Sequence, residues 1–375
     1  METSCLIQEP QKKQKLNEED EEINRNGKCL ADLPEEILRH ILSFLPTKDA
    51  VRTCLLSKRW EYLWASIPNV DFEQSFDSPI KMSKSKRRLL MNFVERLLCL
   101  RESYAIKRFA LRCDVLHDVA RVNTWISAVV RHNVQELDID LDELKGEYSL
   151  PYCLFTYKTL TSLNLYMPCI LKLPKTVWFS NLKNLTINSV TFSDEYLTQN
   201  FFSGLSVLEK LSLTDCSWGT LKVVRLYAPK LHSLSIWECE RPDSNYGDGC
   251  QIMIFAVQLK EFDYFGELYS AYCLNNSFSL EKAEIEALPQ NNTAQIAHRT
   301  YKLLIGLSNV KLLALSCNVL EVWLPLFVIS NLTVSYQHNG GKIKLSFNCL
   351  HKCGMIKLMA YKGKLLFYVF MLFEL

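Results

Sequence analysis

Leu160-Thr161-Ser162-Leu163-Asn164-Leu165 carries a pattern, apolar-x-x-apolar-x-apolar, that recurs throughout residues 106–315. Successive copies lie about 25 residues apart, a period typical of solenoids, in which each unit buries its apolar residues against its neighbours. The middle apolar residues of the nine copies are Phe109, Leu137, Leu163, Leu185, Leu211, Leu234, Phe262, Ala283 and Leu313.

Each copy predicts one short strand. The last two apolar residues are two positions apart, so both side chains point to one face, while the residues between and after them point to the other. Stacked strands of this kind predict a curved parallel sheet on the inside, with helices and loops outside. Residues 119–131 fit one outer helix, which Asn133 can end. Its apolar face consists of Val122, Trp125, Ile126 and Val129.

Residues 29–75 have the pattern of a small module of three helices. Pro34 suits a first helical turn, and Pro46 ends that helix. A second helix can start near Thr47, and Ser57 can cap a third. A module of this size buries little surface, so we expect part of its apolar surface to contact another protein. The apolar stripe of the first helix consists of Ile37, Leu38, Ile41, Leu42 and Leu45.

The residue order of this module closely resembles an F-box in its plant form. The matching segments are Leu33-Pro34-x-Glu36-Ile37, Ile41-Leu42-Ser43-x-Leu45-Pro46-x-Lys48 and Leu56-Ser57-Lys58-Arg59-Trp60-x-x-Leu63-Trp64. With repeats of leucine-rich-repeat period, the chain is similar to plant F-box/leucine-rich-repeat proteins over residues 29–335. The predicted fold class is therefore α/β, with a three-helix F-box followed by a leucine-rich-repeat solenoid over residues 105–335.

The resemblance implies a substrate receptor of a ubiquitin ligase without catalytic residues of its own. Its F-box would bind a Skp-type adaptor, and through it a cullin scaffold, while the repeats hold an unknown protein substrate for ubiquitination. The alternative is a repeat scaffold or decoy that binds its partner without assembling a ligase. The predicted adaptor-binding residues, some of which must build the module's own core, are Leu33, Pro34, Ile37, Ile41, Leu45, Leu55 and Trp60.

The outward residues of the strands are candidates for substrate binding because they have no packing role. Aromatic residues exposed among polar neighbours are typical interface anchors, although a covering loop can also bury them. Paired aspartates two positions apart can serve in acid-base chemistry, but outward carboxylates in a repeat wall are normally solvated or bind partners. The predicted substrate-binding residues are Asp138, Asp140, Tyr166, Trp237 and Phe265.

The composition narrows the partners. The 375 residues include 43 Lys and Arg against 41 Asp and Glu, whereas nucleic-acid-binding domains are usually strongly basic. No apolar stretch approaches the ~20 residues of a membrane-spanning helix, and the N-terminus has no secretory signal. We therefore expect no nucleic-acid or membrane partner, a location in the nucleus and/or cytoplasm, and 14 cysteines that are free and buried.

Two segments flank the F-box. Residues 1–28 contain few apolar residues and are predicted to be a disordered tail. Residues 76–104 are predicted to be a linker that opens into an amphipathic helix, because a basic run precedes apolar residues at helical spacing. A nuclear address is the alternative for this basic run, which consists of Lys81, Lys84, Lys86, Arg87 and Arg88.

The sequence predicts neither a catalytic site, a metal site nor a cofactor. It contains no nucleophile elbow, phosphate-binding loop or His-Glu-x-x-His helix. Cys349, His351 and Cys353 resemble zinc ligands, but a tetrahedral site needs four, and Cys317 is only a loose candidate for the fourth. Residues 336–375 form an atypical C-terminal segment without the pattern of the FBD domain in which many similar proteins end.

Overall fold

The chain forms two compact units in the computed structural model, residues 1–64 and 65–375. The structure describes residues 33–73, 84–101, 105–114, 118–142, 144, 146–238, 249–275, 278–288, 294–307, 310–316 and 319, together with strands between residues 333 and 369. The predicted tail, Lys81, Cys317, Cys349, His351 and Cys353 lie outside these residues.

The first unit contains the first two predicted helices and short 3-10 segments in place of the third. The two helices begin directly after Pro34 and Pro46, as the sequence predicts. Beyond them, the Trp60 N–H donates to the Ser57 carbonyl three residues earlier, at 3.0 Å, which is 3-10 geometry. The elements are α2 (Glu35–Leu42), α3 (Thr47–Arg52), η2 (Thr53–Leu55), η3 (Lys58–Trp60) and η4 (Leu63–Ser66).

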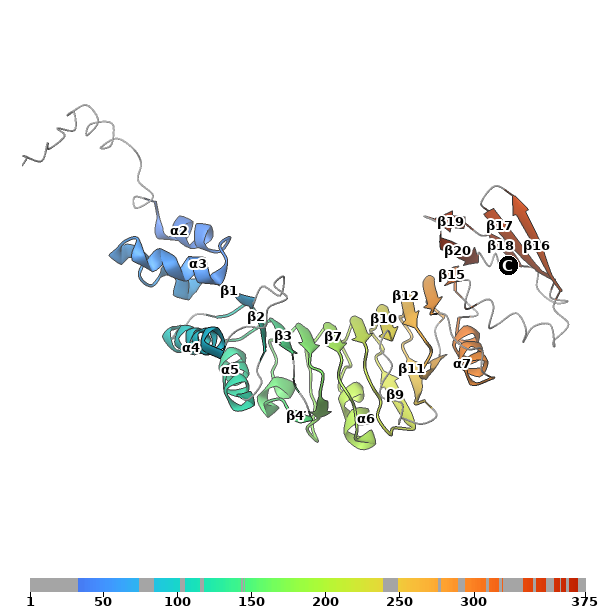
Figure 1. The fold of residues 1–375 in the computed structure, drawn as a ribbon, viewed down its shortest axis with the longest axis horizontal. Coiled ribbons are helices and arrows are strands. Elements are labelled where there is room, and N and C mark those ends of the chain that lie inside the picture. The colour runs from blue at the N-terminus through green and yellow to red at the C-terminus, as the bar shows by residue number, and fades with distance from the viewer. Residues whose placement is uncertain are drawn as a thin grey trace, which may run out of the picture. The chain divides into compact units, whose positions relative to one another are not determined.

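The second unit is built on a sheet that contains all nine predicted strands, which confirms the repeat solenoid (Figure 1). The strands are parallel and in register, so that Leu185 lies opposite Leu163 on one side and Leu211 on the other. The nine are β2 (Arg108–Asp114), β3 (Glu136–Asp142), β5 (Ser162–Tyr166), β7 (Asn184–Asn188), β8 (Lys210–Thr214), β10 (Ser233–Glu238), β12 (Glu261–Gly266), β14 (Lys282–Ala287) and β15 (Leu312–Ser316).

One further parallel strand of the sheet, at its N-terminal end, was not predicted. Strand β1 (Asn69–Glu73) pairs in parallel with β2, and its Val70 and Phe72 are buried. With Ile67, these residues form a tenth copy of the repeat pattern. This copy lies within the range predicted for the F-box. The next copy along the chain, at Phe109, is much more than one repeat period away, so the spacing did not reveal the strand. Only two residues separate the first repeat strand from the last 3-10 segment, η4.

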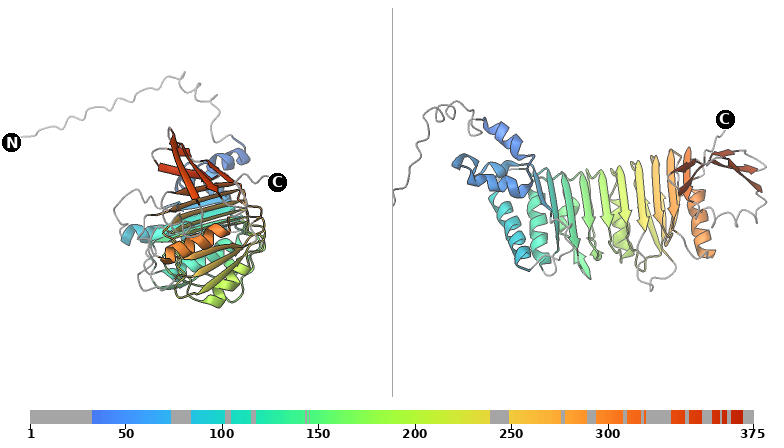
Figure 2. Two further views of the ribbon diagram at one scale, coloured as in Figure 1. Left: turned by 90° about the vertical axis from the view of Figure 1, so that its right-hand side faces the viewer. Right: turned by 45° about the horizontal axis from the view of Figure 1, so that its top comes forward.

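Helices and smaller sheets cover the side of the repeat sheet that faces away from the concave wall (Figures 1 and 2). The predicted helix over residues 119–131 is confirmed as α5, with its apolar face buried and Asn133 at a φ of 61° directly beyond it. Helix α4 lies within the range predicted for the linker and amphipathic helix, and it includes most of the basic run. The outer helices are α4 (Lys84–Leu100), α5 (Val119–Arg131), α6 (Glu195–Ser203) and α7 (Ala294–Ile305).

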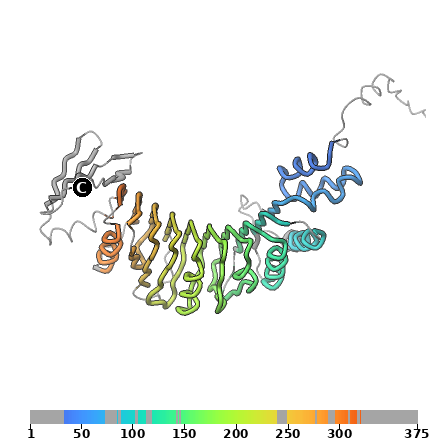
Figure 3. Tube along the Cα trace, turned by 180° about the vertical axis from the view of Figure 1, so that it is seen from behind, coloured from blue at the N-terminus to red at the C-terminus, as the bar shows by residue number. Residues whose placement is uncertain are grey.

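Strands form part of this outer layer, where the sequence predicted helices and loops. The parallel strands β9 (Val223–Tyr227), β11 (Gln251–Phe255) and β13 (Ala271–Asn275) form one sheet, and β4 (Glu147–Ser149) pairs with β6 (Ile170–Lys172). The alternation of buried and outward residues in these strands, such as Ile252 and Ile254 beside Met253, is too short to distinguish them from loops. Figure 3 shows the stack of repeats curving with the main sheet on its inner side.

The C-terminal segment contains antiparallel strands. Strand β20 pairs with β15, so it continues the main sheet in the opposite direction. The remaining strands pair with one another or with β20. They are β16 (Thr333–Asn339), β17 (Lys342–Asn348), β18 (Gly354–Lys357), β19 (Met359–Tyr361) and β20 (Lys364–Val369).

The stacked inward side chains predict a clear difference between neighbouring positions of one strand. Ile187 of β7 is fully buried, whereas Thr186 is a half-buried residue of the concave face. Ile187→Ala should lower the free energy of unfolding by about 2–5 kcal/mol, and Thr186→Ala by less than about 1 kcal/mol. Urea unfolding followed by circular dichroism measures both; equal losses would contradict the inward assignment of Ile187.

Candidate functional site

The register of the sheet arranges the outward residues of the concave wall in rows. Four of the five predicted substrate-binding residues, Asp140, Tyr166, Trp237 and Phe265, belong to one row near the carboxyl ends of the strands. Asn188 and Thr214 continue the row between Tyr166 and Trp237. The fifth residue, Asp138, lies in the adjacent row. The sequence therefore identified residues of one surface.

The register also separates these residues into two groups. Trp237 and Phe265 lie on neighbouring strands, but Tyr166 is three strands from Trp237, about 14 Å away at the usual strand spacing. Tyr166 instead lies opposite Asp140 on β3. A partner that contacts both groups must extend across the sheet.

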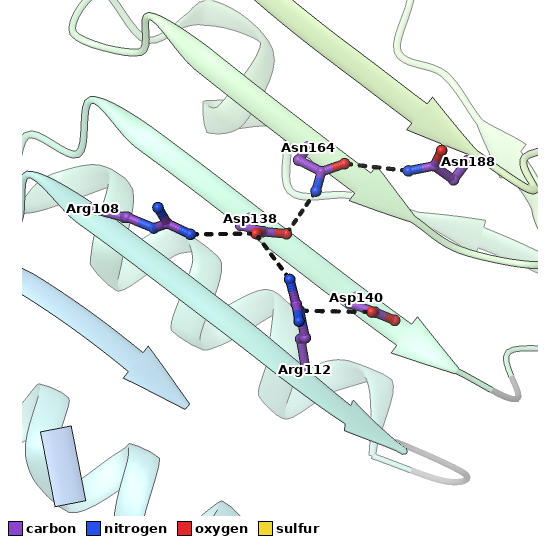
Figure 4. A network of polar contacts seen from close by, with 6 residues as sticks. All are labelled: Arg108, Arg112, Asp138, Asp140, Asn164 and Asn188. Atoms are coloured by element: carbon purple, nitrogen blue, oxygen red, sulfur yellow. Dashed lines mark hydrogen bonds and ion pairs between the residues drawn. The ribbon is translucent and has the colours of Figure 1, made fainter. Parts of the chain in front are cut away.

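A network of charged and amide side chains joins strands β2, β3, β5 and β7 at the first group (Figure 4). The Asp138 carboxylate lies 3.8 Å from the Arg108 guanidinium and 3.9 Å from that of Arg112. It also accepts a hydrogen bond from the Asn164 amide at 2.9 Å, and Asn188 donates to Asn164 at 3.3 Å. Arg112 lies 3.9 Å from Asp140 as well. The network holds these side chains in a fixed arrangement.

The network gives Asp138 and Asp140 ion-pair and hydrogen-bond partners within the chain. Each carboxylate lies within ion-pair distance of a guanidinium, so its charge has a partner within the chain. The Asp138 side chain is only 15% exposed. Fixed ion pairs and amide hydrogen bonds of this kind fit a structural or binding surface, where they define the positions of charges that a partner can contact.

The second group is a pair of aromatic rings. The Trp237 and Phe265 ring centroids lie 5.1 Å apart, with the ring planes tilted by 34°. Trp237 is 45% exposed, so in the described part of the chain no loop covers it, whereas Phe265 and Tyr166 are half-buried. A large exposed aromatic ring beside a second ring is the usual form of an interface anchor.

A buried carboxylate fixes the strand ends beneath the aromatic pair. Glu238, the residue after Trp237, is 5% exposed. It accepts hydrogen bonds from the hydroxyls of Tyr264 at 2.6 Å and Tyr272 at 2.5 Å, and from the Tyr269 N–H at 3.1 Å. Burial raises the pKa of the Glu238 carboxyl, although these hydrogen bonds act in the opposite direction.

Gly266 completes this support on the neighbouring strand. It follows Phe265, lies opposite Glu238 and has a φ of 149°. A Cβ atom at this position would be 2.5 Å from the Glu238 carbonyl oxygen, so only glycine allows the two strand ends to approach so closely. Sequence reasoning missed Glu238, although its position two residues after Ile236 predicts an inward side chain.

The F-box unit exposes several of the predicted adaptor-binding residues. Pro34 is exposed, Ile37 is 45% exposed and Leu55 85% exposed. Leu45 is also exposed, and Leu33 and Ile41 are half-buried. Trp60, in contrast, is 5% exposed, so the structure places it in the core. The surface also includes three large residues that the sequence did not single out, namely Phe44, Leu56 and Tyr62.

The structure also bears on metal ions, membrane spans and cysteines within the residues that it describes. Among them, no cluster of His, Cys, Asp or Glu can hold a metal ion. None of the described helices is long and apolar enough to cross a membrane. The described cysteines form no disulfide, and only Cys169 and Cys250 are buried, so burial is less general than predicted. Burial raises the pKa of both thiols to about 12, which makes them weak nucleophiles.

Both the helical N-terminal part and the repeat part of the chain match known protein families. Residues 30–71 match the F-box domain, and residues 122–251 match the LRR repeats of the FBD-associated F-box protein At5g56370. The F-box/FBD/LRR-repeat protein At3g59240 of Arabidopsis thaliana is 31% identical over 353 residues, covering 89% of this chain and 68% of the relative. The F-box/LRR-repeat protein At3g59200 of the same plant is 32% identical over 346 residues, covering 84% of this chain and 65% of the relative.

The buried Glu238 predicts a pH dependence of stability. Because its pKa is raised in the folded state, its contribution is fully present below the ordinary glutamate pKa and is lost as the pH rises through the raised value. The unfolding free energy of the wild type, relative to Glu238→Gln, should therefore fall by up to about 1.4 kcal/mol per pH unit above about pH 4. Urea unfolding of both proteins across a pH series tests this; a constant or rising difference would contradict it.

Proposed function

Because the chain belongs to the plant F-box/leucine-rich-repeat family, we propose that it is the substrate-recognition subunit of a Skp-cullin-F-box ubiquitin ligase. An F-box generally implies binding to a Skp-type adaptor. The observation that carries the proposal is the amount of apolar surface that the F-box unit leaves exposed. We define this adaptor face by its exposed residues, namely Pro34, Ile37, Phe44, Leu45, Leu55 and Leu56.

The adaptor face supports the proposal for a physical reason. Besides Pro34, five large apolar side chains of the adaptor face are exposed, including Phe44 at 74% and Leu55 at 85%. Many exposed apolar side chains on a small module are costly in water and typically mark a protein interface. Its buried residues, such as Leu38, Leu42 and Trp60, instead hold the helices together.

In this proposal the repeats hold the protein substrate through the concave wall. The ion-pair network around Asp138 and Asp140 and the ring of Tyr166 form one contact region, and Trp237 with Phe265 forms another. The receptor itself needs no catalytic residue or cofactor, because it contributes proximity: it holds a substrate lysine near a ubiquitin-charged enzyme, which raises the effective concentration of the two.

The charge of the chain bears on the kind of substrate, and the proposed function bears on its location. A balanced charge, 43 basic against 41 acidic side chains, favours a protein substrate over nucleic acid. We propose a location in the nucleus and/or cytoplasm, where such a ligase would meet its substrates. A scaffold or decoy that does not join a ligase remains the competing function, and adaptor binding separates the two.

Co-purification with a Skp-type adaptor tests the proposal. Leu55→Ala/Leu56→Ala removes two exposed side chains of the adaptor face, so adaptor binding should fall at least about tenfold, while stability changes little. Tyr196→Ala, which removes a 69% exposed ring from α6 in the repeat unit, is the control and should bind as the wild type does.

The outcomes separate the two functions. Wild-type binding that the double variant loses supports the ligase subunit. If the folded wild type fails to bind a panel of Skp-type adaptors, the chain is a scaffold or decoy instead. If both variants bind equally well, the adaptor face is wrongly assigned.

A further inference from the structure

Two regions of the concave wall differ in the charged residues that they carry. On β2 and β3, Asp138 and Asp140 lie within ion-pair distance of Arg108 and Arg112. On β12 and β14, the outward charged residues are four carboxylates and a single ammonium group, which lies 3.5 Å from Glu284. These residues are Glu261, Asp263, Lys282, Glu284 and Glu286. The described surface of these two strands is therefore acidic.

The register brings like charges together in this region. Asp263 lies directly opposite Glu284 on the neighbouring strand, a pairing that destabilises a sheet. Burial raises the pKa of the Asp263 carboxyl, and Glu284 and Glu261 raise it further, while Lys282 lowers it. An arrangement that costs stability within the chain is typical of a surface that meets its complement in a partner.

The aromatic pair, of which Trp237 is the exposed member, lies at the edge of this acidic region. On β12, Phe265 lies two residues after Asp263, on the same face of the strand. It is opposite Trp237 of β10 on one side and Glu286 of β14 on the other. A cation beside such a ring is attracted both by the π electrons of the ring face and by the negative charge of the neighbouring carboxylates. Arginine fits best, since its planar guanidinium stacks on an aromatic ring while it donates to carboxylates.

We propose that the concave face of β10, β12 and β14 binds an arginine-bearing basic segment of the substrate protein. One guanidinium stacks on the exposed face of Trp237, and neighbouring basic side chains pair with Glu284 and Glu286. We name this surface the acidic-aromatic panel, defined by Trp237, Asp263, Phe265, Glu284 and Glu286. The inference rests on the proposed function, because it names the chemical class of segment that the substrate receptor recognises.

Fluorescence anisotropy tests the panel with labelled synthetic peptides and the full chain. The probes are three short peptides of equal length, in which serine alternates with arginine, lysine or glutamate. The arginine peptide should bind, the lysine peptide should bind more weakly, and the glutamate peptide should not bind. Raising the salt concentration should weaken binding of the arginine peptide, because exposed charges are screened.

Matched variants locate the binding on the surface. Glu284→Gln/Glu286→Gln removes two charges from the panel, and Glu147→Gln/Glu195→Gln removes the same charge from exposed positions of β4 and α6. The first pair should weaken arginine-peptide binding about tenfold, and the second pair less than about twofold. If both double variants lost the same affinity for the arginine peptide, the proposal would be overturned, because the peptide would then be attracted by the overall charge of the protein and not by the panel.

Two tryptophans provide a second, independent comparison. Trp237→Ala should weaken the arginine peptide about tenfold by removing the stacking surface. Trp178→Ala, which removes a 69% exposed ring outside the sheet, should leave binding unchanged. Circular dichroism confirms that each variant is folded. Unchanged binding by folded Trp237→Ala overturns the stacking of arginine on this ring.

Adaptor co-purification of the same proteins separates this inference from the proposed function. If the wild type binds the adaptor but not the arginine peptide, the panel is overturned and the ligase subunit stands. If the peptide binds through the panel but no adaptor binds, the panel stands as part of a scaffold. If the panel variants lost adaptor binding, the panel and the adaptor face would not be independent surfaces, and the assignment of the panel to the substrate would be overturned.

Discussion

The structure depends on the fact that no single repeat can close its own core. Each strand contributes two inward side chains, such as Leu163 and Leu165, and these are buried only because the next strand places Leu185 and Ile187 beside them in register. Parallel pairing in exact register is therefore a condition for burial, since a slip of one residue would turn the apolar pair to the opposite face. Everything on the concave wall takes its position from this condition.

The same condition separates packing from recognition. Inward residues are limited to apolar side chains of suitable size, whereas most of the outward residues between them, such as Asn164, Thr186 and Ser212, are only half-buried. This is why two aspartates, a pair of aromatic rings and a run of carboxylates can occupy the wall of one sheet. The exception is Glu238, a carboxylate on the inward side, which is tolerated because two tyrosine hydroxyls and a backbone N–H satisfy it.

Features whose apolar residues recur at a regular spacing could be predicted from the sequence. It located nine strands and α5 because burial repeats at fixed spacing, and parity placed Asp140, Tyr166, Trp237 and Phe265 on one wall. It did not separate Trp60 from Leu55, because both are apolar residues in short 3-10 segments, where burial depends on tertiary packing. It also missed the partners of Glu238, since Tyr264 and Tyr272 lie on strands of different sheets that only the fold brings together.

The outer strands have a geometric consequence for the wall that they support. Helices packed side by side need about 8–10 Å each, whereas strands need about 4.8 Å, so a solenoid with helices outside must splay apart on that side. Behind β10 and β12 the outer layer is the sheet of β9, β11 and β13, whose spacing equals that of the inner strands. This section therefore needs less splaying than one with helices outside, and the aromatic pair stands on two hydrogen-bonded layers of strands.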